Sequence, residues 1–204
     1  MKKRLIFLIL VSLFFVPRHD KILAAEDEPY LDLGWVYLEK YNEVKNSRLR
    51  TKSLDDAESN FQKALQINPE QGKAFSGLAR VYTRRSLLTP KPIFPLSLLP
   101  KIWTNSQEQK LLNQAIEYGL NAIKYSPADA EAYLATAEAE LQSCTSLESD
   151  KNLSSAFKHL AKAKELAARN PEVYSLYGWA YLSQYYFDGD MKNFKLAIEN
   201  LEQS

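Results

Sequence analysis

One spacing of small, apolar and proline residues recurs along the chain and constrains its fold more than any other feature. Two stretches share this spacing: Ala57-x3-Phe61-x2-Ala64-x4-Pro69 and Ala115-x3-Gly119-x2-Ala122-x4-Pro127. A second pattern, with an aromatic and a small residue four apart, begins six residues after each proline, and its four copies start at Tyr30, Phe75, Tyr133 and Tyr174. Residues three and four apart share a helical face, so each pattern predicts an amphipathic helix. We therefore expect repeated helix pairs that bury their apolar stripes against neighbouring pairs.

The two patterns together resemble the tetratricopeptide repeat, a 34-residue helix pair with Trp-x2-Leu-Gly-x2-Tyr on its first helix and Ala-x3-Phe-x2-Ala, then Pro, on its second. The resemblance implies an all-α fold, a right-handed α-solenoid of antiparallel helix pairs. It divides the chain into a first unit at 27–71, a second at 72–129, a third at 130–170 and an incomplete fourth at 171–204. The complete units are longer than 34 residues, and the extra residues lie between their two helices. This predicts insertions along one edge of the solenoid.

The largest insertion, residues 84–105, is both proline-rich and apolar. Its prolines are Pro90, Pro92, Pro95 and Pro100. Prolines at this density exclude a regular helix, and an exposed stretch this apolar would bind or aggregate. We expect the segment to fold back over its own helices. The alternatives are contact with a partner or subunit, or shallow membrane contact, through Ile93, Phe94 and Trp103.

Helix ends are marked in the sequence as well. Asn170 before Pro171 predicts an N-cap with proline at the first helical position, and residues 126–129 have capping-box character. Asp188-Gly189-Asp190 predicts a turn in which Asp190 caps the last helix.

The carboxyl end departs from a finished repeat array. Tyr181, Tyr185, Tyr186 and Phe187 follow helical spacing and are predicted as core between repeats. The fourth unit stops seven positions short of the standard repeat. Repeat arrays normally end in a polar capping element, so we expect this sequence to be a piece of a longer protein.

The amino-terminal segment has the features of an export signal. Three basic residues, Lys2 to Arg4, precede an unbroken apolar run from Leu5 to Val16. This run is too short to span a bilayer, whereas it suits the hydrophobic region of a secretory signal. We expect cleavage after Ala25, giving residues 1–25 as a signal peptide. The protein is then exported to the periplasm or cell envelope, or held there by an N-terminal membrane anchor if the signal is not cleaved.

Charge and chemistry narrow the function class. The chain has 26 basic and 25 acidic residues, so a strongly basic nucleic-acid-binding protein is excluded. After the signal segment, Cys144 and His159 are the only cysteine and histidine, and nothing in their spacing supplies an orienting group or an anion hole. His159 is predicted as a surface or inter-helix residue. No phosphate loop or metal-ligand spacing appears, so we expect no enzyme activity, no cofactor and no metal site.

The tetratricopeptide resemblance also implies a partner-binding groove, lined by the first helix of each unit. The predicted groove residues are Leu31, Trp35, Leu38, Lys73, Ser76, Arg80, Arg84, Leu134, Glu138, Leu141, Trp179 and Leu182. The second position of the third and fourth units is Glu131 and Glu172. This groove would have aromatic or apolar ends around a basic patch of Lys73, Arg80 and Arg84, suited to a peptide with anchoring side chains and an acid. Alternatively, Trp35 and Trp179 only pack under the insertions.

Two functions follow from these features. The first is an exported, non-catalytic scaffold that binds a protein or peptide, without nucleic acid, and that contacts membrane only through the signal segment or the apolar insertion. The alternative is a regulatory or substrate-recruiting amino-terminal part of a larger exported enzyme.

Overall fold

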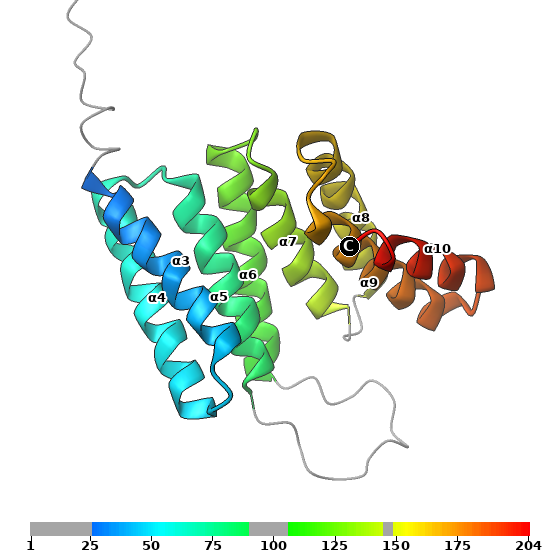
Figure 1. Cartoon of the computed structure of the whole chain (residues 1–204), viewed down its shortest axis with the longest axis horizontal. Coiled ribbons are helices and arrows are strands. Elements are labelled where there is room, and N and C mark those ends of the chain that lie inside the picture. Colours follow the sequence, from blue (N-terminus) through cyan, green and yellow to red (C-terminus); the bar gives the residue numbers. More distant parts are fainter. Residues whose placement is uncertain (1–25, 90–105, 145–148) are drawn as a thin grey trace, which may run out of the picture.

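The protein is all-α in its computed structural model, as the sequence predicts. The structure describes residues 26–89, 106–144 and 149–204, and within these ranges it has helices and no strand. The helices are α3 (Glu28–Glu43), α4 (Ser47–Ile67), α5 (Gly72–Leu87), α6 (Ser106–Tyr125), α7 (Ala130–Ser143), α8 (Ser149–Leu166), α9 (Pro171–Asp188) and α10 (Met191–Leu201) (Figure 1). The predicted signal peptide and its cleavage point lie outside the described residues.

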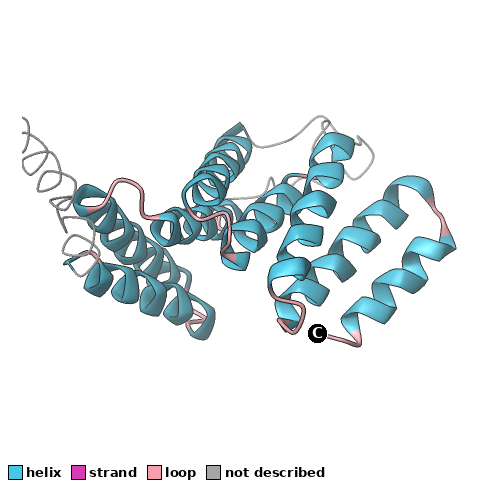
Figure 2. Ribbon diagram, turned by 90° about the horizontal axis from the view of Figure 1, so that it is seen from above, coloured by secondary structure: helices cyan, strands magenta, loops and turns pink. Residues whose placement is uncertain are grey.

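Consecutive helices associate in antiparallel pairs. The most extensive contacts join α3 to α4, α5 to α6, α7 to α8 and α9 to α10. Each predicted unit contains one of these pairs, and the pairs follow one another across the molecule (Figure 2). The first helices also touch in series, α3 with α5, α5 with α7 and α7 with α9. Side chains from four segments that are distant in sequence therefore come together on one surface.

Polar caps begin several of these helices. The Asn170 side chain accepts a hydrogen bond from the backbone N–H of Glu172 at the start of α9, and Asp190 does the same for Lys192 in α10. Both caps were predicted. Gly189 ends α9 in the left-handed region at φ 68°, which permits the tight turn into α10. The cap of α7 is Asp129 itself, rather than a capping box begun by Ser126.

The core of the first two pairs is centred on Phe61. This ring is fully buried and lies between two glycines, Gly34 of α3 and Gly77 of α5. A Cβ atom at Gly34 would approach the Phe61 Cε1 atom to 2.5 Å, so a larger residue would collide with the ring. Trp35 packs edge-on against the same ring, with centroids 5.5 Å apart. The small residue in the repeat pattern therefore makes room for the aromatic residue of the neighbouring helix.

The extra residues of the first two units are partly helical. In the first unit α3 ends at Glu43 and α4 begins at Ser47, so most of the added length extends the helices. In the second unit α5 continues to Leu87, beyond the predicted start of the insertion at Arg84. Ile93, Phe94 and Trp103, its predicted contact residues, lie outside the described residues.

The aromatic cluster at the end of α9 is only partly core. Tyr181 packs on Phe157 of α8, with ring centroids 5.0 Å apart, and Tyr185 packs on a phenylalanine of α10. Tyr186 is 84% exposed and Phe187 43% exposed, so the core prediction is wrong for these two. The reason is geometric. The helix α10 covers only one side of α9, and the C-terminal end of α9 extends past the neighbouring helices (Figure 1).

No helix in the part of the chain that the structure describes has both the length and the apolar character needed to span a membrane.

Candidate functional site

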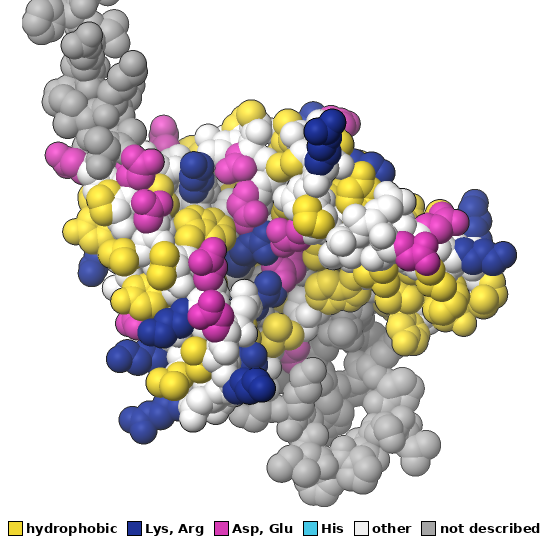
Figure 3. Space-filling view, in the orientation of Figure 1, with side chains coloured by type: hydrophobic (Ala, Val, Ile, Leu, Met, Phe, Trp, Pro, Cys, Tyr) yellow, Lys and Arg dark blue, Asp and Glu magenta, His cyan; other side chains and the backbone are white. Residues whose placement is uncertain are grey.

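A small pocket opens where the first helices of all four pairs meet. Its volume is about 220 Å³. The lining residues are Trp35, Leu38, Glu39 and Asn42 of α3, Arg80 and Arg84 of α5, Glu131 of α7 and Glu172 of α9. Acidic and basic side chains gather in the middle of the face drawn in Figure 3, with apolar side chains on either side. The pocket is smaller than the roughly 300 Å³ at which drug-sized ligand sites begin, so it suits a single side chain.

Arg80 is the centre of the pocket's polar structure. Its guanidinium binds Glu131 through two nitrogens, with Nε 2.5 Å from Oε1 and Nη2 3.0 Å from Oε2. Its Nη1 atom lies 3.2 Å from Glu138 Oε2 and 2.7 Å from Glu172 Oε1. One arginine therefore ties α5 to both α7 and α9, and each of its three nitrogens has a carboxylate partner.

Glu138 is the most buried carboxylate of this network. Its side chain is 7% exposed, and it pairs with Arg84 as well as with Arg80. Arg84 is 24% exposed and reaches the rim of the pocket. Sharing one buried carboxylate between two arginines compensates part of the cost of removing these charges from water.

Burial and neighbouring charges both shift the pKa values of Arg80 and Glu131. Burial alone would lower the pKa of the Arg80 guanidinium, but the carboxylates of Glu131, Glu138 and Glu172 raise it well above its usual value. Burial raises the pKa of the Glu131 carboxyl, against the opposing effect of Arg80. The Glu172 and Asp129 charges raise it further. The arginine therefore stays charged, and the negative charge of Glu131 is incompletely compensated.

The polar groups at the rim of α3 are free in the described structure. Glu39 and Asn42 are exposed, and neither has a hydrogen bond or ion pair to another described residue. Neither was predicted, although they follow Trp35 at the fourth and seventh positions and so lie on its helical face. Helical spacing from Trp35 would have found both.

The structure brings together only some of the predicted groove residues. Trp35, Leu38, Arg80 and Arg84 line the pocket, with Glu138 beneath them. Ser76, Leu134 and Leu141 are buried to 1% exposure or less, and Leu31 to 5%, so these four belong to the core. Lys73 is exposed, whereas Trp179 and Leu182 are half-buried on α9, and none of these three lines the pocket.

The patch that was predicted to be basic contains both basic and acidic side chains, with the acidic ones slightly in excess. Arg80 and Arg84 are both paired with carboxylates, and Lys73 is exposed away from the pocket lining. The lining holds two arginines against three glutamates, Glu39, Glu131 and Glu172. The reason for the correction is that α7 and α9 bring their carboxylates to α5, a contact that repeat spacing does not specify.

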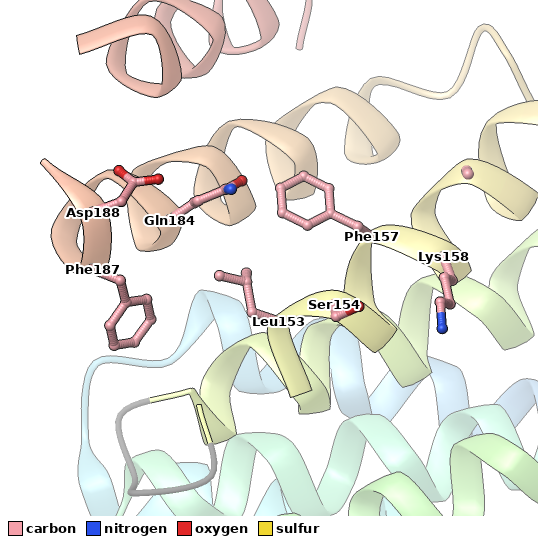
Figure 4. Close-up of a pocket in the computed structure, with 8 residues that line it drawn as sticks. Leu153, Ser154, Phe157, Lys158, Gln184, Phe187 and Asp188 are labelled. Atoms are coloured by element: carbon pink, nitrogen blue, oxygen red, sulfur yellow. The ribbon is translucent and has the colours of Figure 1, made fainter. Parts of the chain in front are cut away.

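A second, more open cleft of about 760 Å³ lies between α8 and α9. It is lined by Leu153, Ser154, Phe157, Lys158, Ala161, Gln184, Phe187 and Asp188. In Figure 4, Leu153 and Phe157 extend from α8 and Phe187 from α9 toward the same space, while Lys158 and Asp188 stand at its two ends. The sequence did not predict this cleft, and its lining holds no grouping suited to catalysis.

His159, the one histidine among the described residues, makes an inter-helix contact, as predicted. His159 Nδ1 lies 2.8 Å from Glu140 Oε2, and Ser155 Oγ donates to Glu140 Oε1 at 2.6 Å. The hydroxyl and the imidazole thus contact one carboxylate rather than each other, which differs from a nucleophile and its base. Among the described residues, no group of His, Cys, Asp and Glu is arranged to hold a metal ion.

The sequence was compared with protein-family models and with curated proteins. No protein-family model matches the chain, and no curated protein is significantly similar to it.

Proposed function

We propose that this protein is a non-catalytic interaction module of tetratricopeptide type, a right-handed superhelix of helix pairs that binds a peptide or protein partner. The observation that carries the proposal is the convergence of α3, α5, α7 and α9 on one pocket. In a tetratricopeptide array the first helices line the binding surface, and here the first helices touch in series and supply every residue of that pocket.

The composition of the pocket favours recognition over catalysis. Trp35 supplies a half-buried aromatic surface, and arginine and tryptophan are the residues most enriched where interface energy concentrates. Apart from Glu39, the charged groups are paired with one another rather than placed beside a nucleophile. The pocket therefore fits an anchoring side chain of a bound chain segment.

We further propose that the module works after export, in the periplasm or cell envelope. The basic residues Lys2 to Arg4 and the apolar run that follows support this assignment.

The test is a comparison of captured proteins. Immobilised wild-type protein and the Trp35→Ala variant would each be incubated with an envelope extract, and bound proteins identified by mass spectrometry. We expect the variant to lose the partner while keeping its helical circular dichroism spectrum. Leu49→Ala is the matched control, because Leu49 is a 51% exposed apolar residue on α4, away from the pocket. Equal capture by wild type and Trp35→Ala would contradict the proposal.

A further inference from the structure

We propose that the side chain received by this pocket is basic, a lysine or arginine of the partner, bound between Trp35 and the acidic rim. The inference rests on the proposed function and specifies the chemistry of the same site. It reverses the expectation from the sequence, in which a basic patch selects an acidic peptide.

Arg80 and Arg84, the cations of the pocket, are already paired with carboxylates. Arg80 uses Nε, Nη1 and Nη2 on the carboxylates of Glu131, Glu138 and Glu172. Arg84 is directed to Glu138. A partner carboxylate entering here would have to share these arginines with the glutamates already paired to them, and it would lie beside those glutamates. Like charges so placed disfavour the complex.

The free polar groups of the pocket supply hydrogen-bond acceptors. The Glu39 carboxylate and the Asn42 amide lack partners among the described residues, and both face the pocket. Glu172 pairs through Oε1, which leaves Oε2 available at a side chain that is 35% exposed. An entering ammonium or guanidinium would meet the Glu39 carboxylate, the Asn42 carbonyl and this oxygen, each of which accepts hydrogen bonds.

Trp35 supplies an aromatic surface on one side of the pocket. Trp35 is half-buried, and its edge-on contact with Phe61 fixes the orientation of the indole. Tryptophan is the strongest cation–π partner among the side chains. Leu38 lines the same side and can cover the methylene stem of a lysine or arginine, whose charged head stays at the polar rim.

Size and charge point to the same ligand. A volume of about 220 Å³ is below the roughly 300 Å³ at which drug-sized ligand sites begin, and it suits one long side chain. Two arginines against three lining glutamates leave the pocket one negative charge in excess, and the buried Glu138 adds a second. A single cationic side chain would offset part of this excess.

The experiment is a selection from a random heptapeptide library displayed on phage, carried out on immobilised wild type, Trp35→Ala, Glu39→Gln and Glu117→Gln. Glu39→Gln removes a pocket charge without breaking a described ion pair. Glu117→Gln removes the same charge from an exposed position on α6, outside the pocket, and is the matched control. We expect Lys and Arg to be enriched among peptides selected on wild type and on Glu117→Gln, with the enrichment reduced on Glu39→Gln.

The affinities of one selected peptide for wild type and for the variants make this prediction quantitative. Its binding to Glu39→Gln should be roughly three- to fivefold weaker than to wild type, and this difference should shrink at high ionic strength because salt screens the exposed Glu39 charge. Its binding to Glu117→Gln should stay within about twofold of wild type. Replacing its basic residue with norleucine should weaken wild-type binding and abolish the effect of Glu39→Gln.

The outcomes separate the two proposals. Peptides that need Trp35 but show no enrichment of Lys or Arg, or an enrichment of Asp and Glu, would overturn the basic-ligand inference and leave the binding function standing. Selected peptides that bind Trp35→Ala as well as wild type would overturn both.

Discussion

Replacing Arg80 with alanine tests whether the central ion pairs hold the helix pairs together. The variant would leave three carboxylates facing one another without their shared cation. Removing one partner of a buried ion pair costs about 3–5 kcal/mol. Glu138 is 7% exposed and keeps Arg84, whereas Glu131 and Glu172 are 28% and 35% exposed, so water screens part of the effect. We therefore expect the lower end, a loss of about 3 kcal/mol in the free energy of unfolding near neutral pH.

The assay is urea denaturation followed by far-ultraviolet circular dichroism, repeated between neutral and acidic pH. Once Arg80 is absent, the clustered carboxylates favour protonation, so the stability lost by the variant should shrink as the pH falls. Arg85→Ala is the control on the same helix, because Arg85 pairs with Asp55 and Glu58, of which Asp55 is 61% exposed. Its loss should be about 1 kcal/mol or less. A loss for Arg80→Ala no larger than that of Arg85→Ala, or one that does not change with pH, would refute the reasoning.

Three further predictions concern the core, one titrating group and one helix end. Gly77→Ala should lower the free energy of unfolding by about 1–2 kcal/mol, because the new Cβ would lie 2.5 Å from the Cε1 and Cε2 atoms of Phe61. In denaturation measurements, the double variant with Phe61→Leu should recover part of this loss. The pKa of Glu131 is raised above 4.5 in the fold, so its contribution to stability is greatest below about pH 4.5 and is lost as the pH rises through the raised value. The stability of wild type relative to Glu131→Gln should accordingly decrease from about pH 4.5 to neutral pH, and an increase would contradict the assignment. Asn170→Ala should cost about 1 kcal/mol in thermal or urea unfolding, because it removes the N-cap of α9, and an unchanged midpoint would show that the cap contributes nothing.

Much of the local structure could be predicted from the sequence. The positions of the helices follow from apolar residues at three- and four-residue spacing, and the caps at Asn170 and Asp190 follow from side chains that compete well for free backbone N–H groups. The contact between Phe61 and Gly34 was also foreseeable, because the repeat pattern pairs a large residue on one helix with a small one on the next. The helices and caps depend on neighbours within one or two helical turns, and the contact between Phe61 and Gly34 depends on the pairing of consecutive helices.

The site was predictable only in part. Trp35, Leu38, Arg80 and Arg84 were placed on the binding surface by their positions in the repeat, and they do line one pocket. Buried residues such as Leu134 and Leu141 were placed there as well, because a repeat position does not reveal how closely the next helix packs. The exposure of Tyr186 and Phe187 has the same origin, since it depends on where α10 lies against α9.

The sequence by itself determined the helices, their pairing pattern and the residues at their ends, because helical geometry repeats every few residues and acts locally. Tertiary structure decided the charge of the candidate site. Arg80 reaches Glu131 across 51 residues of sequence and Glu138 across 58, and these contacts turn a row of basic residues into a pocket with negative charge in excess. The physical reason is that an electrostatic environment depends on the distance between charges in space, which is set only when the helix pairs pack together.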